Sequence, residues 1–157
     1  MTVRDRDNGA QRLLQIARQR PRIDIGVIGP KAQAAKKGGA GGPSLVEVAS
    51  AHEFGVDVPR RSFIADWADL SESNALRRLK RVMRHVIKNN ANLTDSMDVF
   101  GHWAVGEIQE RISQGIPPEL SEARKAQKRV NGLSGNTPLI HTGQLRSSIS
   151  HRTVVDG

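Results

Sequence analysis

The side chains in this sequence that could perform catalysis do not stand at the spacing that such chemistry needs. His52 and Glu53 begin an H-E pair, but a zinc-binding H-E-x-x-H motif requires a second histidine where the chain has Val56. Five histidines are scattered along the chain and there is no cysteine, which excludes disulfides, thiolate nucleophiles and cysteine-ligated zinc. We therefore predict no metal, no cofactor and no catalytic residue.

Two further groupings match a catalytic or phosphate-binding arrangement only in part. Ser147 and Ser148 lie close to His151 and Asp156, yet no G-x-S-x-G elbow exposes a serine as a nucleophile. The segment at 30–44 is rich in glycine and lysine, but it lacks the G-x-x-x-x-G-K-[ST] order of a phosphate loop. An enzyme, for example a small nuclease or peptidase, is therefore not favoured.

The segment at 30–44, PKAQAAKKGGAGGPS, has too few apolar side chains to order itself by burial. We expect a long flexible hairpin or surface loop there. Two interpretations stay open. One is a solvated loop, and the other is an arm that becomes ordered on a neighbouring subunit or DNA through Lys31, Lys36 and Lys37.

The clearest charge pattern lies on a predicted helix that ends at Asn89. Apolar side chains recur along one face of it, at Leu76, Leu79, Met83, Val86 and Ile87. The opposite face carries Arg77, Arg81, Arg84 and Lys88. With a net charge of +8, two interpretations stay open for this basic face: a solvated surface, or contact with an acidic protein or DNA phosphate. No aromatic side chains lie between the basic ones, so any DNA contact would be non-specific.

Hydrophobic periodicity and capping signals place the elements that carry these residues. Ser44 and Glu47 form an S-x-x-E capping box that begins a helix ending at Gly55. Before that helix we expect a short helix or arm at 9–20 and a strand at 22–29. After it we expect two longer helices, one from about 66 or 73 to 89 and one at 96–114 that Thr94 or Asp95 caps. The chain should end with a charged helix at 119–131, a helical turn at 142–148 and a strand at 149–155. The fold class is α+β: a small antiparallel or mixed sheet packed against two longer helices.

Composition limits the size of the core. The chain has 157 residues, 37% of them hydrophobic and 3% aromatic, so we expect an N-terminal arm or short helix at 1–21 and a single α+β domain at 22–157. Such a small core could gain stability from an assembly. No apolar run is long enough to span a bilayer, and we expect a soluble protein made in the cytoplasm.

Three short motifs stand out along the chain: HEFG at 52–55, PRRSFI at 59–64 and PLIHTGQLRSSI at 138–149. We expect Phe54 and Phe63 to hold the connection around Pro59 onto the sheet, and Arg61 to pair with an acidic neighbour. In the third motif, we expect Thr142 to cap the turn that Gly143 begins, Leu145 to point inward and Arg146 to point outward.

In their order and spacing these motifs resemble the neck and tail-completion proteins of long-tailed phages and the related virion morphogenesis proteins of Mu-like phages. The resemblance extends over most of the chain from Ile23 onward. The glycine- and lysine-rich insertion at 30–43 departs from many relatives, which leaves the position in the neck open. Family-motif residues that could be structural or interfacial are His52, Glu53, Phe54, Gly55, Pro59, Arg61, Phe63, Thr142, Gly143, Leu145 and Arg146. Two roles also stay open for Trp103, a core side chain or an anchor for a partner.

The resemblance implies a non-catalytic structural protein that forms a ring, most often a hexamer, in the virion. Its expected partners are further copies of itself, head-completion or connector proteins, and the tail terminator or tail tube protein. Genomic DNA would pass through the lumen, where the basic helix could contact it non-specifically, and no membrane is involved. The alternative function is a non-specific DNA-binding protein that uses the basic face at 77–88.

Overall fold

A computed structural model describes residues 9–29, 32, 42–131, 136–140 and 143–155. Within these ranges the chain forms six helices and one two-stranded sheet. The elements are α1 (Gly9–Arg18), β1 (Arg22–Val27), α2 (Leu45–Phe54), α3 (Ala65–Asn89), α4 (Leu93–Gln114), α5 (Glu122–Val130), α6 (Gln144–Ser148) and β2 (Ile149–Val154). The expected α+β class is confirmed.

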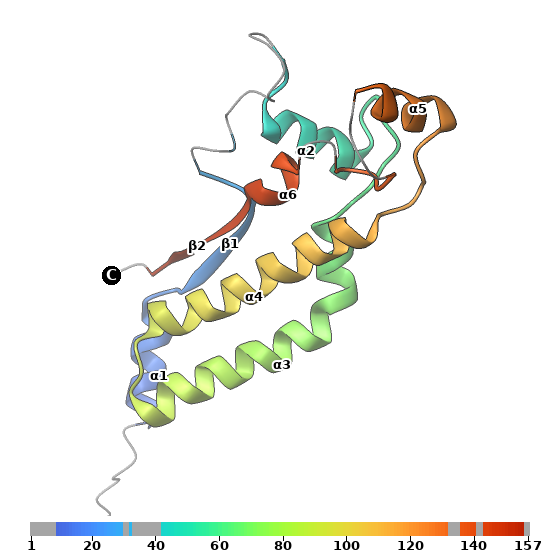
Figure 1. The fold of residues 1–157 in the computed structure, drawn as a ribbon. Helices are drawn as coiled ribbons and strands as arrows, with labels where there is room; N and C mark the ends of the chain where they lie inside the picture. Colours follow the sequence, from blue (N-terminus) through green and yellow to red (C-terminus); the bar gives the residue numbers. More distant parts are fainter. Residues whose placement is uncertain (1–8, 30–31, 33–41, 132–135, 141–142, 156–157) are drawn as a thin grey trace, which may run out of the picture.

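Helix α4 is the centre of the fold. It contacts both strands of the β1–β2 ribbon and it also packs against α3, which runs beside it as the second arm of a helical hairpin (Figure 1). Helices α2 and α6 lie together at one end of the ribbon, and α1 contacts α3 near the opposite end of the molecule (Figure 1). The long helices are therefore covered unequally, because α4 is enclosed and α3 is an outer element.

The sequence predicts a buried stripe on α4 of Met97, Phe100, Ala104, Ile108 and Ile112, and this is confirmed except for Phe100, which is half-buried. Met97, Ala104, Ile108 and Ile112 are buried, and Gly115 ends the helix with its N–H bonded to the Ile112 carbonyl. The predicted start was wrong. The helix begins at Leu93, and Asn92 caps it by accepting from the Asp95 N–H at 3.1 Å. An asparagine side chain can accept a hydrogen bond from a free N–H at the start of a helix as well as the predicted threonine or aspartate can. The observed cap therefore lies earlier in the chain than predicted.

The sheet joins two strands that lie near opposite ends of the described chain. Strands β1 and β2 pair antiparallel, with Asp24 opposite Arg152 and Ile25 opposite His151. Arg152 donates to the Asp24 carboxylate at 2.7 Å on the exposed face. Alternating side chains of both strands turn toward α4, as the period of two predicts. The two predicted strands are therefore confirmed, although each ends earlier than predicted, at Val27 and at Val154.

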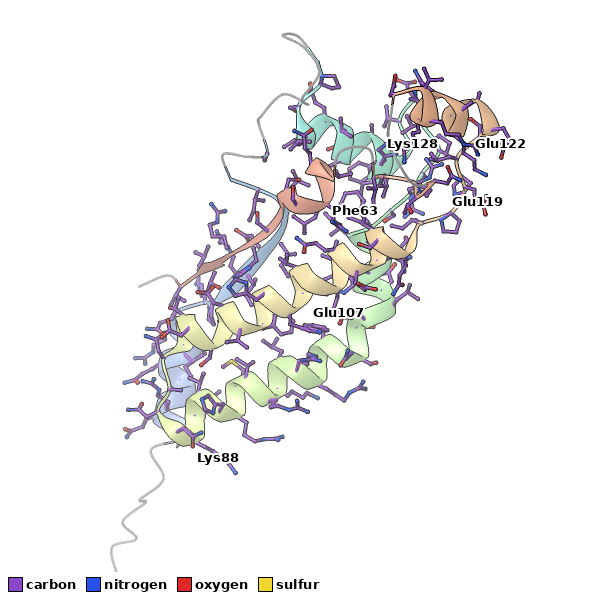
Figure 2. The ribbon with its side chains drawn as sticks, viewed as in Figure 1. Phe63, Lys88, Glu107, Glu119, Glu122 and Lys128 are labelled. Atoms are coloured by element: carbon purple, nitrogen blue, oxygen red, sulfur yellow. The ribbon has the colours of Figure 1, made fainter. Side chains whose placement is uncertain are left out.

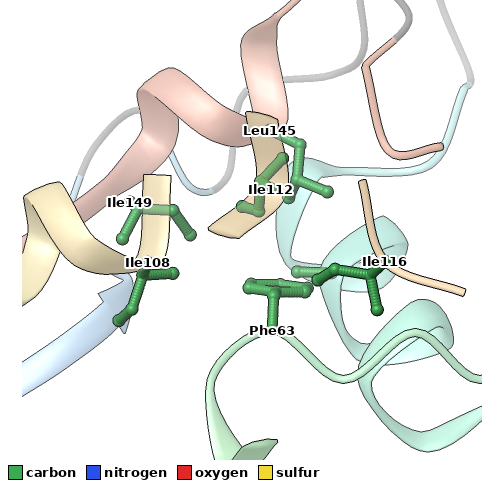
Figure 3. Packing of buried hydrophobic residues seen from close by; sticks show 7 residues of the cluster. Phe63, Ile108, Ile112, Ile116, Leu145 and Ile149 are labelled. Atoms are coloured by element: carbon green, nitrogen blue, oxygen red, sulfur yellow. The ribbon is translucent and has the colours of Figure 1, made fainter. Parts of the chain in front are cut away.

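Two apolar clusters hold these layers together. The larger one surrounds Phe63 and includes Ile108, Ile112, Ile116, Leu145 and Ile149 (Figure 3). The smaller one, near the turn between α3 and α4, consists of Ile16, Val86, Leu93 and Met97. Because Ile16 belongs to α1, the first helix is tied to the body of the protein by apolar burial.

The helix boundaries adjust the predictions in small ways. Ser44 and Glu47 form the expected capping box, with the Ser44 N–H donating to Glu47 at 2.6 Å. Helix α3 begins at Ala65, close to the earlier of its two predicted starts. Most of the predicted glycine- and lysine-rich loop, including Lys31, Lys36 and Lys37, lies outside the described residues, and Ala32 within it is buried.

Candidate functional site

The first two motifs meet at the side chain of Glu53, which is buried at the end of α2. Its Oε1 accepts from the Ser62 hydroxyl at 2.6 Å and from the Ala65 N–H at 2.8 Å. Its Oε2 accepts from the N–H groups of Phe63 at 2.9 Å and Ile64 at 3.2 Å. One carboxylate therefore joins HEFG to PRRSFI and occupies the N-terminal end of α3.

This arrangement supplies a cap that α3 otherwise lacks. Ile64 stands at the N-cap position and offers no side-chain oxygen. The carboxylate of Glu53 accepts a hydrogen bond from the Ala65 N–H, and the Ser62 hydroxyl accepts one from the Asp66 N–H at 3.2 Å. A negative charge at this end also interacts favourably with the helix dipole. The sequence alone did not assign this role to Glu53.

The environment of Glu53 acts on its pKa in two opposing ways. Burial raises the pKa, while the Ser62 hydroxyl and the backbone N–H groups of Ala65, Phe63 and Ile64 lower it. The net direction is downward, so the carboxylate is held ionised. This group acts as a structural acceptor, because all of its contacts are hydrogen bonds from neighbouring donors.

Arg61 contacts backbone carbonyls, which corrects the expected pairing with an acidic side chain. It is 4% exposed. Its Nε donates to the Pro118 carbonyl at 2.8 Å, and its Nη2 donates to the Glu119 carbonyl at 3.2 Å. Burial lowers the pKa of the Arg61 guanidinium. The residue therefore fastens the segment between α4 and α5 onto the second motif.

Phe63 and Phe54 differ in burial. Phe63 is fully buried at the centre of the larger cluster, as expected, whereas Phe54 is 74% exposed and holds nothing onto the sheet. The expectation for Phe54 was wrong because Leu45, Ala49 and Glu53 take the buried face of α2. Phe54 follows directly after Glu53 and so points about 100° away from that face.

The third motif reaches the same cluster through α6. Gly143 adopts a left-handed conformation with φ of 73° at the start of this helix. Leu145 is buried against the Phe63 cluster, as expected. Arg146 is exposed, also as expected, and donates to the Ser113 hydroxyl at 2.9 Å on α4. The predicted cap Thr142 lies outside the described residues.

A cavity of about 670 Å³ opens beside the joined motifs, between α2, α5 and the segment at 137–140. Apolar side chains such as Leu45 and Val48 line it, together with Arg61 and Lys128. The Lys128 Nζ is buried and donates to the Thr137 carbonyl at 3.1 Å and the Ile140 carbonyl at 2.6 Å. Burial lowers the pKa of Lys128. Sequence reasoning missed this residue, because backbone carbonyl partners leave no pattern in the sequence.

The basic face predicted on α3 is exposed along its length. Arg77, Arg81, Arg84 and Lys88 are all exposed, and among the described residues none of them forms an ion pair with a carboxylate. Figure 2 shows Lys88 at the far end of α3, near the turn that leads to α4. The guanidinium of neighbouring Arg78 lies 4.5 Å from the ring centre of Trp103. The face is therefore available to phosphate or an acidic protein.

The predicted apolar face of α3 is only partly covered, because Met83 and Ile87 pack against the smaller cluster whereas Leu76 is 48% exposed. Val86 is the one residue of this 25-residue helix that is buried. Leu76, Leu79, Met83 and Ile87 line a groove together with Lys80, Arg84 and Lys88. This corrects the prediction that Arg84 and Lys88 lie on the opposite face, because both stand beside the apolar side chains. Among the described residues, α3 alone lines this groove.

Trp103 packs within the chain between the two long helices. Its ring lies 6.1 Å from that of Trp67 and 5.3 Å from that of Phe100, and its Nε1 donates to Glu107 at 3.1 Å. Figure 2 labels Glu107 along α4. The side chain is half-buried, so its contacts are those of a core-edge residue.

The serine and histidine residues near the C-terminus serve local structure. Ser147 donates to the Gln144 carbonyl and Ser148 donates to the Leu145 carbonyl. The His151 ring is instead directed to Asp98, at 3.3 Å. In the part of the chain that the structure describes, no three histidine or carboxylate side chains cluster as a metal site would require. Across the same residues, no helix combines the length and the apolarity of a membrane span.

No family model, curated protein or solved structure matches this chain.

Proposed function

We propose that this protein is a non-catalytic structural component of a tailed-phage virion, in which it forms a ring at the head–tail junction. The ring joins head-completion proteins to the tail terminator or tail tube, and it contains six copies. The protein is made in the host cytoplasm and resides in the neck of the particle. The motif resemblance motivates this assignment, and the geometry of the motifs supports it.

The observation that carries the proposal is the convergence of all three motifs on one cluster. Glu53 of the first motif binds the backbone of the second, and Phe63 of the second shares a core with Leu145 of the third. Segments distant in sequence therefore build one structural unit. Motif residues that cooperate in this way are what a common fold requires.

The exposed surface also suits a subunit with neighbours. Phe54 on α2, Leu70 on α3 and Val99 on α4 are 74%, 71% and 68% exposed. In a ring, neighbouring subunits would cover side chains of this kind. The basic face of α3 would meet the genome if it lines the ring.

Cryo-electron microscopy of intact particles that carry this chain, focused on the neck, tests the proposal. We expect ring-shaped density between the portal side and the tail into which the α3–α4 hairpin and the β1–β2 ribbon fit. Mass spectrometry of the same purified particles is the control for presence of the chain. Absence of the chain from mature particles, or its location in the capsid shell, would overturn the proposal.

The exposed basic residues of α3 favour a second candidate function, non-specific DNA binding. Four cations on one helical face without carboxylate partners among the described residues match the electrostatic requirement for phosphate contact. Salt separates the two functions. DNA affinity that depends on phosphate contacts falls steeply as salt rises, whereas a ring held by packing persists.

A further inference from the structure

The groove of α3 continues into a longer seam that the described part of the chain leaves open. Its apolar part consists of Leu76, Leu79 and Met83, and Asp69 and Glu72 extend it toward the N-terminus at alternating steps of three and four residues. This is the spacing of a helix that pairs with another helix. Leu76 is 48% exposed although it lies in the middle of α3.

Charge is segregated along this seam. The N-terminal part carries Asp69 and Glu72, both exposed, and the segment at 73–89 contains no acidic residue. The C-terminal part is flanked by Lys80, Arg84 and Lys88. Among the described residues neither Asp69 nor Glu72 forms an ion pair. One end of the seam is thus acidic and unpaired, and the other end is basic and unpaired.

We propose that a second copy of this chain covers the groove, with the two α3 helices packed antiparallel about a two-fold axis near Leu79. This arrangement sets Glu72 of each copy beside Arg84 of the other, and Asp69 beside Lys88. A parallel arrangement would instead place each basic residue beside itself, which like charges disfavour. The two-fold contact uses the same patch on both copies, so it is separate from the head-to-tail contacts of a ring and does not depend on the proposed function.

Sedimentation analysis of the full chain tests the pairing through a charge swap. We expect a dimer whose dissociation constant rises at least about fivefold in Glu72→Arg and in Arg84→Glu, because each interface contains the pair twice. The double variant Glu72→Arg with Arg84→Glu should return to near the original dissociation constant. Within one chain these residues are twelve positions apart, roughly 18 Å along the helix, so rescue requires contact between copies.

Disulfide trapping is the second test, and the absence of cysteine from the chain makes it specific. Leu79→Cys places a thiol at the axis, where it should form a covalent dimer under mild oxidation. Arg81→Cys is the matched control, since it lies at the same height on the basic face and should not cross-link. A monomer at every concentration, or single charge variants that leave the dimer unchanged, would overturn the proposal.

The results also separate this proposal from the ring. Suppose that the dimer is weakened by the single charge variants and restored by the double variant, and that the protein is absent from virions. The α3 pairing would then be supported and the proposed function would be wrong. The opposite result is a ring in the neck whose α3 variants assemble normally and whose Leu79→Cys variant does not cross-link. That result would support the proposed function and overturn the α3 pairing.

Discussion

The carboxylate of Glu53 accepts the N–H of Ala65 at 2.8 Å, so the last turn of α2 caps the first turn of α3. The distance along the chain is only twelve residues, yet the contact fixes the direction in which the 25-residue helix α3 leaves the core. Glu53 therefore has a defined structural role as the cap of α3.

Glu53→Gln should destabilise the protein by about 2–3 kcal/mol, because an amide retains one acceptor oxygen and turns an N–H donor toward other donors. Urea unfolding followed by circular dichroism measures the free energy of unfolding. Glu107→Gln is the control, since that exposed side chain makes a single contact with Trp103 and its change should cost less than about 0.5 kcal/mol. Equal losses in the two variants would contradict the capping role.

Stability should fall in acid partly through the same group. The pKa of Glu53 is lower in the folded protein than its ordinary value of 4.5. A carboxyl group with a lowered pKa stabilises the fold above its unfolded pKa, and this contribution disappears as the pH falls through the folded pKa. The free energy of unfolding should therefore decrease below about pH 4.5 and decrease less steeply in Glu53→Gln. Parallel acid limbs in the two proteins would exclude Glu53 as a contributor.

Sequence patterns were sufficient to predict an element and its buried face where one side of the element packs against the core. The period of two placed β1 and β2, and the recurrence of Met97, Ala104, Ile108 and Ile112 placed the inner face of α4. Sequence patterns could not predict how far the apolar face of α3 is covered. An apolar stripe has the same spacing in the sequence whether it faces the chain's own core or an open groove. Sequence patterns also missed the partners of Arg61 and Lys128, since any residue supplies a backbone carbonyl.

Gly101 makes the close approach of α4 to β2 possible. A Cβ atom at this position would lie 2.2 Å from the His151 ring, whereas one at Gly106 would meet nothing within 4 Å. Gly101→Ala should therefore lower the free energy of unfolding by about 1–3 kcal/mol through overpacking. Gly106→Ala is the matched control and should raise it by about 0.5–1 kcal/mol, because alanine favours the helix. Thermal unfolding of both variants checks the sign, and stabilisation by Gly101→Ala would refute the close packing.

Arg61→Lys should be more damaging than a conservative change usually is. A lysine has no planar fork with which to hold the Pro118 and Glu119 carbonyls at once, and one buried acceptor would be left unpaired. We expect a loss of about 1–3 kcal/mol in urea unfolding. Arg60→Lys, at an exposed position paired with Asp66, should cost less than about 0.5 kcal/mol. A reversed order of the two losses would show that Arg61 does not fasten this segment.

The basic face makes a prediction that distinguishes phosphate contact from general positive charge. Arg77→Gln combined with Arg81→Gln removes two exposed cations that lie away from the α3 groove. If both contact DNA, the slope of log affinity against log salt should become shallower by about 1.8, at about 0.9 for each phosphate released. Arg124→Gln combined with Arg129→Gln changes the net charge equally on α5 and should leave the slope unchanged. Fluorescence anisotropy with a duplex of arbitrary sequence over a salt series measures both variants. Equal changes in slope would mean that α3 is not the DNA-contacting surface, and that the affinity reflects the overall charge of the protein.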